Sequence, residues 1–286
     1  MSTQRRAWRA LTERLKESLP AETAGAFIGG SHTQEFADNL LPGLSEREVA
    51  LARDQLAEGD GGELSPTRTG KRSAHAPYSS AALAVNAFAR WMSAPIDLQV
   101  AGLSGFDRVR LEEKLRISHG GGVANLDCGL RGPDLNVRVE SKLTEMLQPH
   151  EPVDWRKPYR SEAMRELLDG SWRDVFDRSL ALRWTPRHLG LEQLLKHALA
   201  INSHLDGRAE HLVYLYWEPS NGDDFAEVVQ HRAELAQLLE ALGPGPQPRF
   251  NALTYAELFD EWTSLPRPAW VGEHVDQLRR RYQLSI

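Results

Sequence analysis

The stretch from Arg108 to Leu143 constrains the fold more than any other part of this sequence. Apolar and polar residues alternate in three runs, RVRLEEKLRI, VANLDCGL and LNVRVESKL, which are separated by SHGGG and RGPD. A period of two is typical of strands with one buried face, and Gly, Pro and Asp are typical of turns. The sequence therefore predicts a three-stranded antiparallel meander.

Helical patterns lie on both sides of this meander. Helix-start signals precede several of them, namely Ser45 with Glu48, Ser79 or Ser80, and Thr254 with Glu257. We expect loops and short helices over 148–187, a helix over 189–205, a buried strand in HLVYLYWEP, a helix over 223–242, a short strand in RFNAL and a last helix ending in RRRY. Strands that alternate with helices predict an α/β (α+β) core behind a helical N-terminal part.

Length and composition limit the class of protein. The chain has 286 residues, 41% of them hydrophobic and 26% charged, as in globular proteins with a sizeable core. We expect an N-terminal helical region over 1–95 packed on a core over 96–286, with one single domain as the alternative.

No run is long and apolar enough to cross a membrane. The one cysteine, Cys128, excludes an internal disulfide, and a cytoplasmic protein is expected. A net charge of -6 still leaves room for a local basic cleft that binds nucleic acid.

Strand parity predicts where the charged residues of the meander point. In the second strand Asp127 lies opposite in parity to Leu126 and Cys128, and in the third strand Glu140 and Lys142 lie opposite to Val139. If both apolar faces pack on one core, Asp127, Glu140 and Lys142 converge on the other face. Glu112 has the same polar parity in the first strand, whereas Glu113 is an acid in the apolar register.

Carboxylates on adjacent strands form a candidate site for a hard divalent cation. Asp127, Glu140 and the carbonyl of Ser141 supply the oxygen ligands that Mg²⁺ prefers, and Mn²⁺ is a potential substitute. Lys142 emerges beside these ligands, where its charge can orient a metal-bound water. Such a site is suited to phosphodiester hydrolysis. The alternative is a solvated sheet face with cross-strand ion pairs of about 0.2–1 kcal/mol.

The motif Asp127…Glu140-Ser141-Lys142 resembles that of the PD-(D/E)xK nuclease superfamily, and the wider frame resembles a bacterial group of restriction-endonuclease-like proteins. The resembling pieces are SSAALAVNAF (79–88), LEEKL (111–115), ANLD (124–127), VESKLTE (139–145) and QLLKH (193–197). The resemblance implies a restriction-endonuclease-like core with a mixed central sheet flanked by helices. It further implies a Mg²⁺-dependent endonuclease in which Asp127, Glu140 and Lys142 are assisted by Gln193 and by Glu112 or Glu113. The Pro133-Asp134 pair also looks like part of the motif, but we assign it to a turn.

Two basic segments are candidates for contact with DNA. Arg68, Lys71 and Arg72 lie in a stretch from Leu64 to Ser80 without an acid, and Arg156 and Lys157 alternate with aromatic residues. A solvated loop is the alternative for the first segment and a packed loop for the second. His197 shares a helix face with Gln193, and it is either a site residue or a polar residue on the helix surface. Duplex cleavage needs two sites, so a homodimer is consistent with this function.

Two other functions are alternatives to a nuclease. One is a non-catalytic binding or assembly module that retains the fold, and the other is a phosphohydrolase of small phosphate esters.

Overall fold

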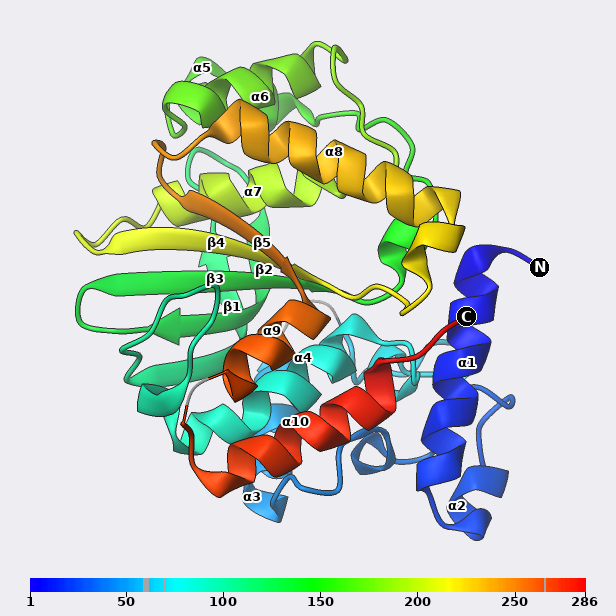
Figure 1. Cartoon of the computed structure of the whole chain (residues 1–286). Coiled ribbons are helices and arrows are strands. Elements are labelled where there is room, and N and C mark those ends of the chain that lie inside the picture. Colours follow the sequence, from blue (N-terminus) through cyan, green and yellow to red (C-terminus); the bar gives the residue numbers. More distant parts are fainter. Residues whose placement is uncertain (59–61, 69, 265) are drawn as a thin grey trace.

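A five-stranded mixed sheet forms the centre of the molecule (Figure 1). The computed structural model describes residues 1–58, 62–68, 70–264 and 266–286. The strands stand in chain order: β1 (Arg108–Arg116), β2 (Val123–Arg131), β3 (Leu135–Lys142), β4 (Ala209–Tyr216) and β5 (Arg249–Thr254). β1, β2 and β3 pair antiparallel, whereas β3, β4 and β5 pair parallel. The predicted meander and the α/β class are therefore confirmed.

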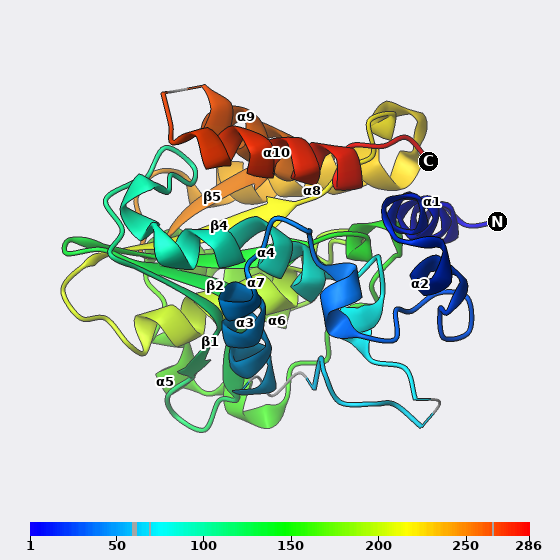
Figure 2. The same cartoon turned by 90° about the horizontal axis from the view of Figure 1, so that it is seen from below.

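Helices cover both faces of the sheet. α5, α6, α7 and α8 lie on one face, and α3, α4, α9 and α10 lie on the other, with α1 and α2 beside one end (Figures 1 and 2). The bounds are α1 Thr3–Ser18, α2 Ala21–Gly25, α3 Glu46–Glu58, α4 Ser80–Phe88, α5 Glu162–Arg165, α6 Gly170–Leu180, α7 Leu191–Asn202, α8 Ala226–Leu242, α9 Tyr255–Thr263 and α10 Ala269–Tyr282. No helix in the described ranges is long and apolar enough to cross a membrane.

The predicted helix-start signals act as caps. Ser79, rather than Ser80, caps α4, and its side chain accepts a hydrogen bond from the backbone N–H of Ala82. Thr254 and Glu257 form a capping box at the start of α9, and Ser45 and Glu48 exchange the same pair of bonds before α3. Every residue from Ala81 to Phe88 is buried, as the apolar sequence of α4 predicts.

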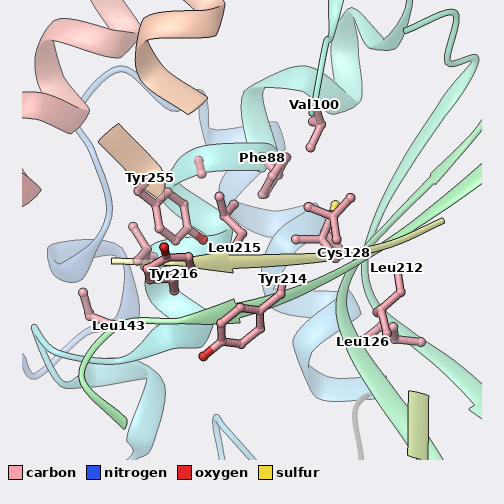
Figure 3. Packing of buried hydrophobic residues seen from close by; sticks show 14 of the residues in the cluster. Phe88, Val100, Leu126, Cys128, Leu143, Leu212, Tyr214, Leu215, Tyr216 and Tyr255 are labelled. Atoms are coloured by element: carbon pink, nitrogen blue, oxygen red, sulfur yellow. The ribbon is translucent and has the colours of Figure 1, made fainter. Parts of the chain in front are cut away.

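One hydrophobic core extends from Ala7 to Leu284 and draws on both ends of the chain. α1 and α10 lie side by side in both views, and the Arg281 guanidinium donates to the Leu11 carbonyl at 2.6 Å. Figure 3 shows the part of this core where Phe88 of α4 meets Cys128 of β2. Cys128 is fully buried, as its parity predicts.

The predicted alternation of β1 and β2 breaks in the middle of both strands. Leu111 pairs with Cys128 and Glu113 pairs with Leu126, but the opposed residues Glu112 and Asp127 lie outside the ladder. Glu112 has a left-handed backbone with φ 50°, which a residue with a Cβ rarely adopts. In Figure 3 Cys128 points toward Phe88, whereas Leu126 points toward Leu212. The expectation that Leu126 and Cys128 share one face is therefore wrong, because the distortion at Glu112 and Asp127 reverses the alternation.

Candidate active site

The site lies in a fork between β2 and β3. Their pairing ends at Cys128 and Val139, while β3 continues along β4 as far as Lys142. The side chain of Asp127 enters the fork and its Oδ2 accepts the Ser141 N–H at 2.7 Å. The N–H and C=O of one extended residue leave the strand on the same side. The Ser141 carbonyl is therefore directed toward the fork as well.

A cavity of about 760 Å³ opens over this fork. It is enclosed by the N-terminal ends of α4 and α7, by α1 and by the segment that precedes α4. Its lining includes the predicted residues Glu112, Asp127, Glu140, Ser141, Lys142 and Gln193. The structure therefore brings together the motif residues from β1, β2, β3 and α7, although β1 and β2 do not alternate as predicted.

Glu140 is the most enclosed acid of this cavity. It is 1% exposed, its Oε2 lies 2.7 Å from His197 Nε2, and its Oε1 forms an ion pair with Lys142. Burial by itself would raise the pKa of Glu140, but the charge of Lys142 and the contact with His197 outweigh it and lower that pKa to about 2. The alternative of a solvated sheet face is therefore wrong for Glu140. His197 therefore contacts the site directly and is not a polar residue of the helix surface.

Asp127 and Glu112 have the opposite balance. Burial, and then the neighbouring Glu140 charge, raise the pKa of Asp127 well above its usual range. Burial, Glu63 and Glu140 raise the pKa of Glu112 to about 7. Lys142 has a pKa above its ordinary value, because Glu140, Glu145 and Asp127 outweigh the effect of its burial. Of these three acids, Glu140 is therefore held in its ionised form, whereas Asp127 and Glu112 lack enough positive charge nearby to ionise readily.

The two candidate acids of β1 have different surroundings. Glu112 lines the cavity beside Asp127 and Glu140. The Oε2 of Glu113 lies 3.0 Å from Arg138 Nε, over Gly129. Glu112 is therefore the acid of this pair that reaches the site.

The candidate DNA contacts lie in two places. Lys71 and Arg72 line the site cavity, but Arg68 does not. Residues 59–61 and 69 of the connector between α3 and α4 (59–79) lie outside the described residues. Arg156 lines a separate cavity, and Lys157 begins a short 3-10 helix. The aromatic neighbours Trp155 and Tyr159 are buried, as in the packed-loop alternative, and so they present no free ring to a base.

Several residues of the cavity were not among the predicted site residues. Glu145 accepts from the backbone N–H groups of Leu143 and Thr144 at 2.8 and 2.9 Å and from the Ser80 hydroxyl. Trp8 of α1 stacks on Tyr78 with ring centroids 4.5 Å apart, and both rings line the cavity. Glu145 lies within a motif segment and could have been suspected. Trp8 is distant in sequence from the strand and α7 residues of the site, so only the tertiary fold identifies it. Asp134 is exposed in the β2–β3 turn, as assigned.

Comparison with known proteins identifies the family. A family model described as "Restriction Endonuclease associating with ARP" matches residues 9–283. No curated protein matches the chain, and no solved structure does. The matched range includes the sheet, the fork and the whole cavity lining except Gln4 and Trp8. The chain therefore belongs to this restriction-endonuclease family.

Proposed function

We propose that the chain is a metal-dependent nuclease of the PD-(D/E)xK type that hydrolyses phosphodiester bonds, with DNA as its substrate. The observation that carries this proposal is the convergence of Asp127, Glu140 and Lys142 on one cavity at the β2–β3 fork. Membership in a restriction-endonuclease family supports the same chemistry. Lys71 and Arg72 add positive charge to the wall of that cavity, where a phosphate would enter.

The oxygen donors of the fork fit a divalent cation such as Mg²⁺ or Mn²⁺. Asp127, Glu140 and the Ser141 carbonyl would hold it, since carboxylate and carbonyl oxygens suit hard cations. The raised pKa of Asp127, caused by burial and then by the Glu140 charge, indicates a lack of positive charge there. A bound divalent ion would supply that charge and polarise the scissile phosphate.

The side chains around the fork have separate roles in this proposal. Lys142 keeps a permanent positive charge beside the phosphate and orients the attacking water. Glu112, with a pKa of about 7 that results from burial and the charges of Glu63 and Glu140, accepts a proton from that water near neutral pH. Gln193 lies on the first turns of α7 and holds a water or a ligand carboxylate from the cavity wall. His197 keeps the Glu140 carboxylate in position.

Incubation with plasmid DNA and Mg²⁺ or Mn²⁺ tests the proposal. Asp127→Asn and Lys142→Met should each lower the cleavage rate by about 100-fold or more, because each removes charge from the reacting centre. Asp134→Asn is the matched control, since it changes an exposed turn acid of the same type. Cleavage by Lys142→Met at the wild-type rate would contradict the proposal, provided that the variant is folded.

A non-catalytic binding module is the second candidate function. It is favoured by the state of Glu140, whose two oxygens are occupied by Lys142 and His197. In addition, the described ranges contain no ready-made group of three His, Cys, Asp or Glu side chains for a metal. DNA binding without cleavage under any divalent ion would support this function instead. Hydrolysis of small phosphate esters without cleavage of DNA would identify a phosphohydrolase.

A further inference from the structure

A second cavity, of about 310 Å³, adjoins the site on the meander and has a basic lining. Its wall contains five basic side chains and three acids, and Glu112 also lines the site cavity. The basic residues are Arg108, Arg110, Lys114, Arg131 and Arg138, and we refer to the cavity that they line as the arginine groove.

Arg138 is the buried part of this groove. It is 9% exposed, and its Nε lies 3.0 Å from Glu113 Oε2. Neither of these two atoms has an aligned hydrogen-bond partner within the described chain. A buried guanidinium with unmade hydrogen bonds is costly. Arg138 also lines the cavity, so an anion bound there would lie close to its guanidinium.

The outer part of the groove has exposed positive charge. Arg108 and Arg131 face each other across β1 and β2, and both are exposed. Arg131 has only a distant ionic contact, 3.9 Å from Asp206, and Arg108 has no ion pair with any described residue. Planar guanidinium groups bind phosphate oxygens through two donors at once. This spread of charge suits a chain of phosphates better than a single small anion.

The arginine groove leads toward the carboxylates. Arg138 and Glu140 are two residues apart on β3, so they point to the same side with their Cα atoms about 6.6 Å apart. Gly129, which pairs with Arg138 across β2 and β3, leaves room for the Glu113 carboxylate, because a Cβ at this position would lie 2.0 Å from Glu113 Oε2. A strand whose phosphates follow Arg131, Arg108 and Arg138 would therefore arrive at the fork.

We propose that the arginine groove binds the phosphodiester backbone of the substrate strand beside the scissile phosphate. The proposal rests on the proposed nuclease function, since it assigns a direction to the strand that the fork would cut. It adds contacts that do not depend on base identity, because guanidinium groups bound to phosphates do not distinguish sequences.

Salt dependence of DNA binding tests the groove. Fluorescence anisotropy is measured with a labelled oligonucleotide, single-stranded and duplex, in the Asp127→Asn background with EDTA. Arg108→Gln/Arg131→Gln is compared with Arg183→Gln/Arg249→Gln, which removes two exposed charges that line neither cavity. For two lost contacts, the slope of log K against log salt should flatten by about 1.4 on a single strand or 1.8 on a duplex. The control pair should leave the slope unchanged.

Equal slopes in the two double variants would contradict the proposal that the arginine groove binds the phosphodiester backbone. A complete absence of DNA binding by the protein would contradict it as well. Because binding is measured without a divalent ion, this outcome is separate from the cleavage test. If the slope depends on Arg108 and Arg131 but wild type does not cleave DNA, phosphate binding by the arginine groove is supported and the nuclease function is contradicted. If wild type cleaves DNA and the slopes of the two double variants are equal, the nuclease function is supported and phosphate binding by the arginine groove is contradicted.

Discussion

Individual residues of the fork are tightly coupled through charge. Lys142 is 14% exposed at its side chain and Glu140 is 1% exposed, so their ion pair is largely removed from water. Removing one member of such a pair leaves the other charge buried without compensation. Lys142 therefore contributes to stability as well as to the proposed chemistry.

Lys142→Met should destabilise the fold by about 3–5 kcal/mol, because Glu140 would keep only His197 as a partner. Chemical denaturation measures this loss. Adding Glu140→Gln to the variant should recover part of it. Lys196→Met is the matched control. Its partly exposed helical pair with Glu192 contributes about 0.3–0.5 kcal/mol, and the cation–π contacts of its ammonium with Trp155 and Tyr159 add about 0.5–1 kcal/mol. A loss no larger than that of the control would show that the Lys142 pair is a surface interaction.

Metal binding should also be visible without any cleavage assay. Mg²⁺ or Mn²⁺ would offset the repulsion between Asp127 and Glu140, with a stabilisation of about 2.7 kcal/mol at one hundred times the dissociation constant. The melting temperature of wild type should rise with millimolar metal. The rise should be lost in Asp127→Asn and retained in Asp134→Asn. A melting temperature that ignores both ions in all three proteins would count against the metal site.

At the scale of elements, the site depends on a local failure of regular pairing. β2 and β3 separate beyond Cys128 and Val139, and Asp127 uses its side chain where a ladder bond would otherwise form. Glu112 adopts a left-handed backbone at the same level of the sheet. Strained residues of this kind persist only where the surrounding structure holds them in place. The flanking helices α4 and α7 and the connector before α4 enclose the space that this opening creates.

The connector offers a comparison between neighbouring basic residues. Lys71 and Arg72 line the site cavity and Arg68 does not. Lys71→Gln/Arg72→Gln should therefore weaken DNA binding for all sequences alike and flatten the salt dependence by up to about 0.9 log units per duplex phosphate contact. Arg68→Gln should have a smaller effect. Titrations at several salt concentrations measure both. An equal effect of all three residues would mean that they attract DNA only through their overall charge and that Lys71 and Arg72 make no specific phosphate contacts.

Across the whole molecule, histidines are buried in both helical layers. His231 of α8 and His274 of α10 are fully buried, and burial lowers the pKa of each to about 4. Their value in an unfolded chain is 6.5, so the unfolded state takes up protons first as the pH falls. Each histidine therefore reduces stability progressively between pH 6.5 and 4. Asp127 and Glu112 have the opposite effect on the pH dependence of stability. Their pKa values are raised in the folded state, so their contribution to stability becomes more favourable as the pH falls.

The double variant His231→Gln/His274→Gln isolates the histidine contribution. Its stability relative to wild type should improve as the pH falls from 6.5 to 4. The gain should be on the order of 3 kcal/mol for each histidine at the acidic end. Urea denaturation at several pH values measures this difference. Parallel pH profiles for the two proteins would mean that neither histidine is held neutral by the fold.

The sequence by itself determined the local elements. The period-two runs and their turns identified the meander. The capping signals at Ser45, at Ser79 or Ser80, and at Thr254 located three helices, and the spacing of Asp127, Glu140 and Lys142 indicated a common site. These features depend on residues that are close in sequence, where side-chain periodicity and capping chemistry decide the structure.

Only the tertiary structure decided the rest of the site. The reversal of alternation at Glu112 and Asp127, the contact of His197 with Glu140, and the place of Trp8 in the cavity wall depend on packing between distant segments. The same is true of the arginine groove, whose residues come from three strands and are brought together by register. Predictions from sequence periodicity assume regular strands. They cannot anticipate that the pairing of β2 with β3 ends early, because this opening is maintained by contacts with segments that are distant in sequence.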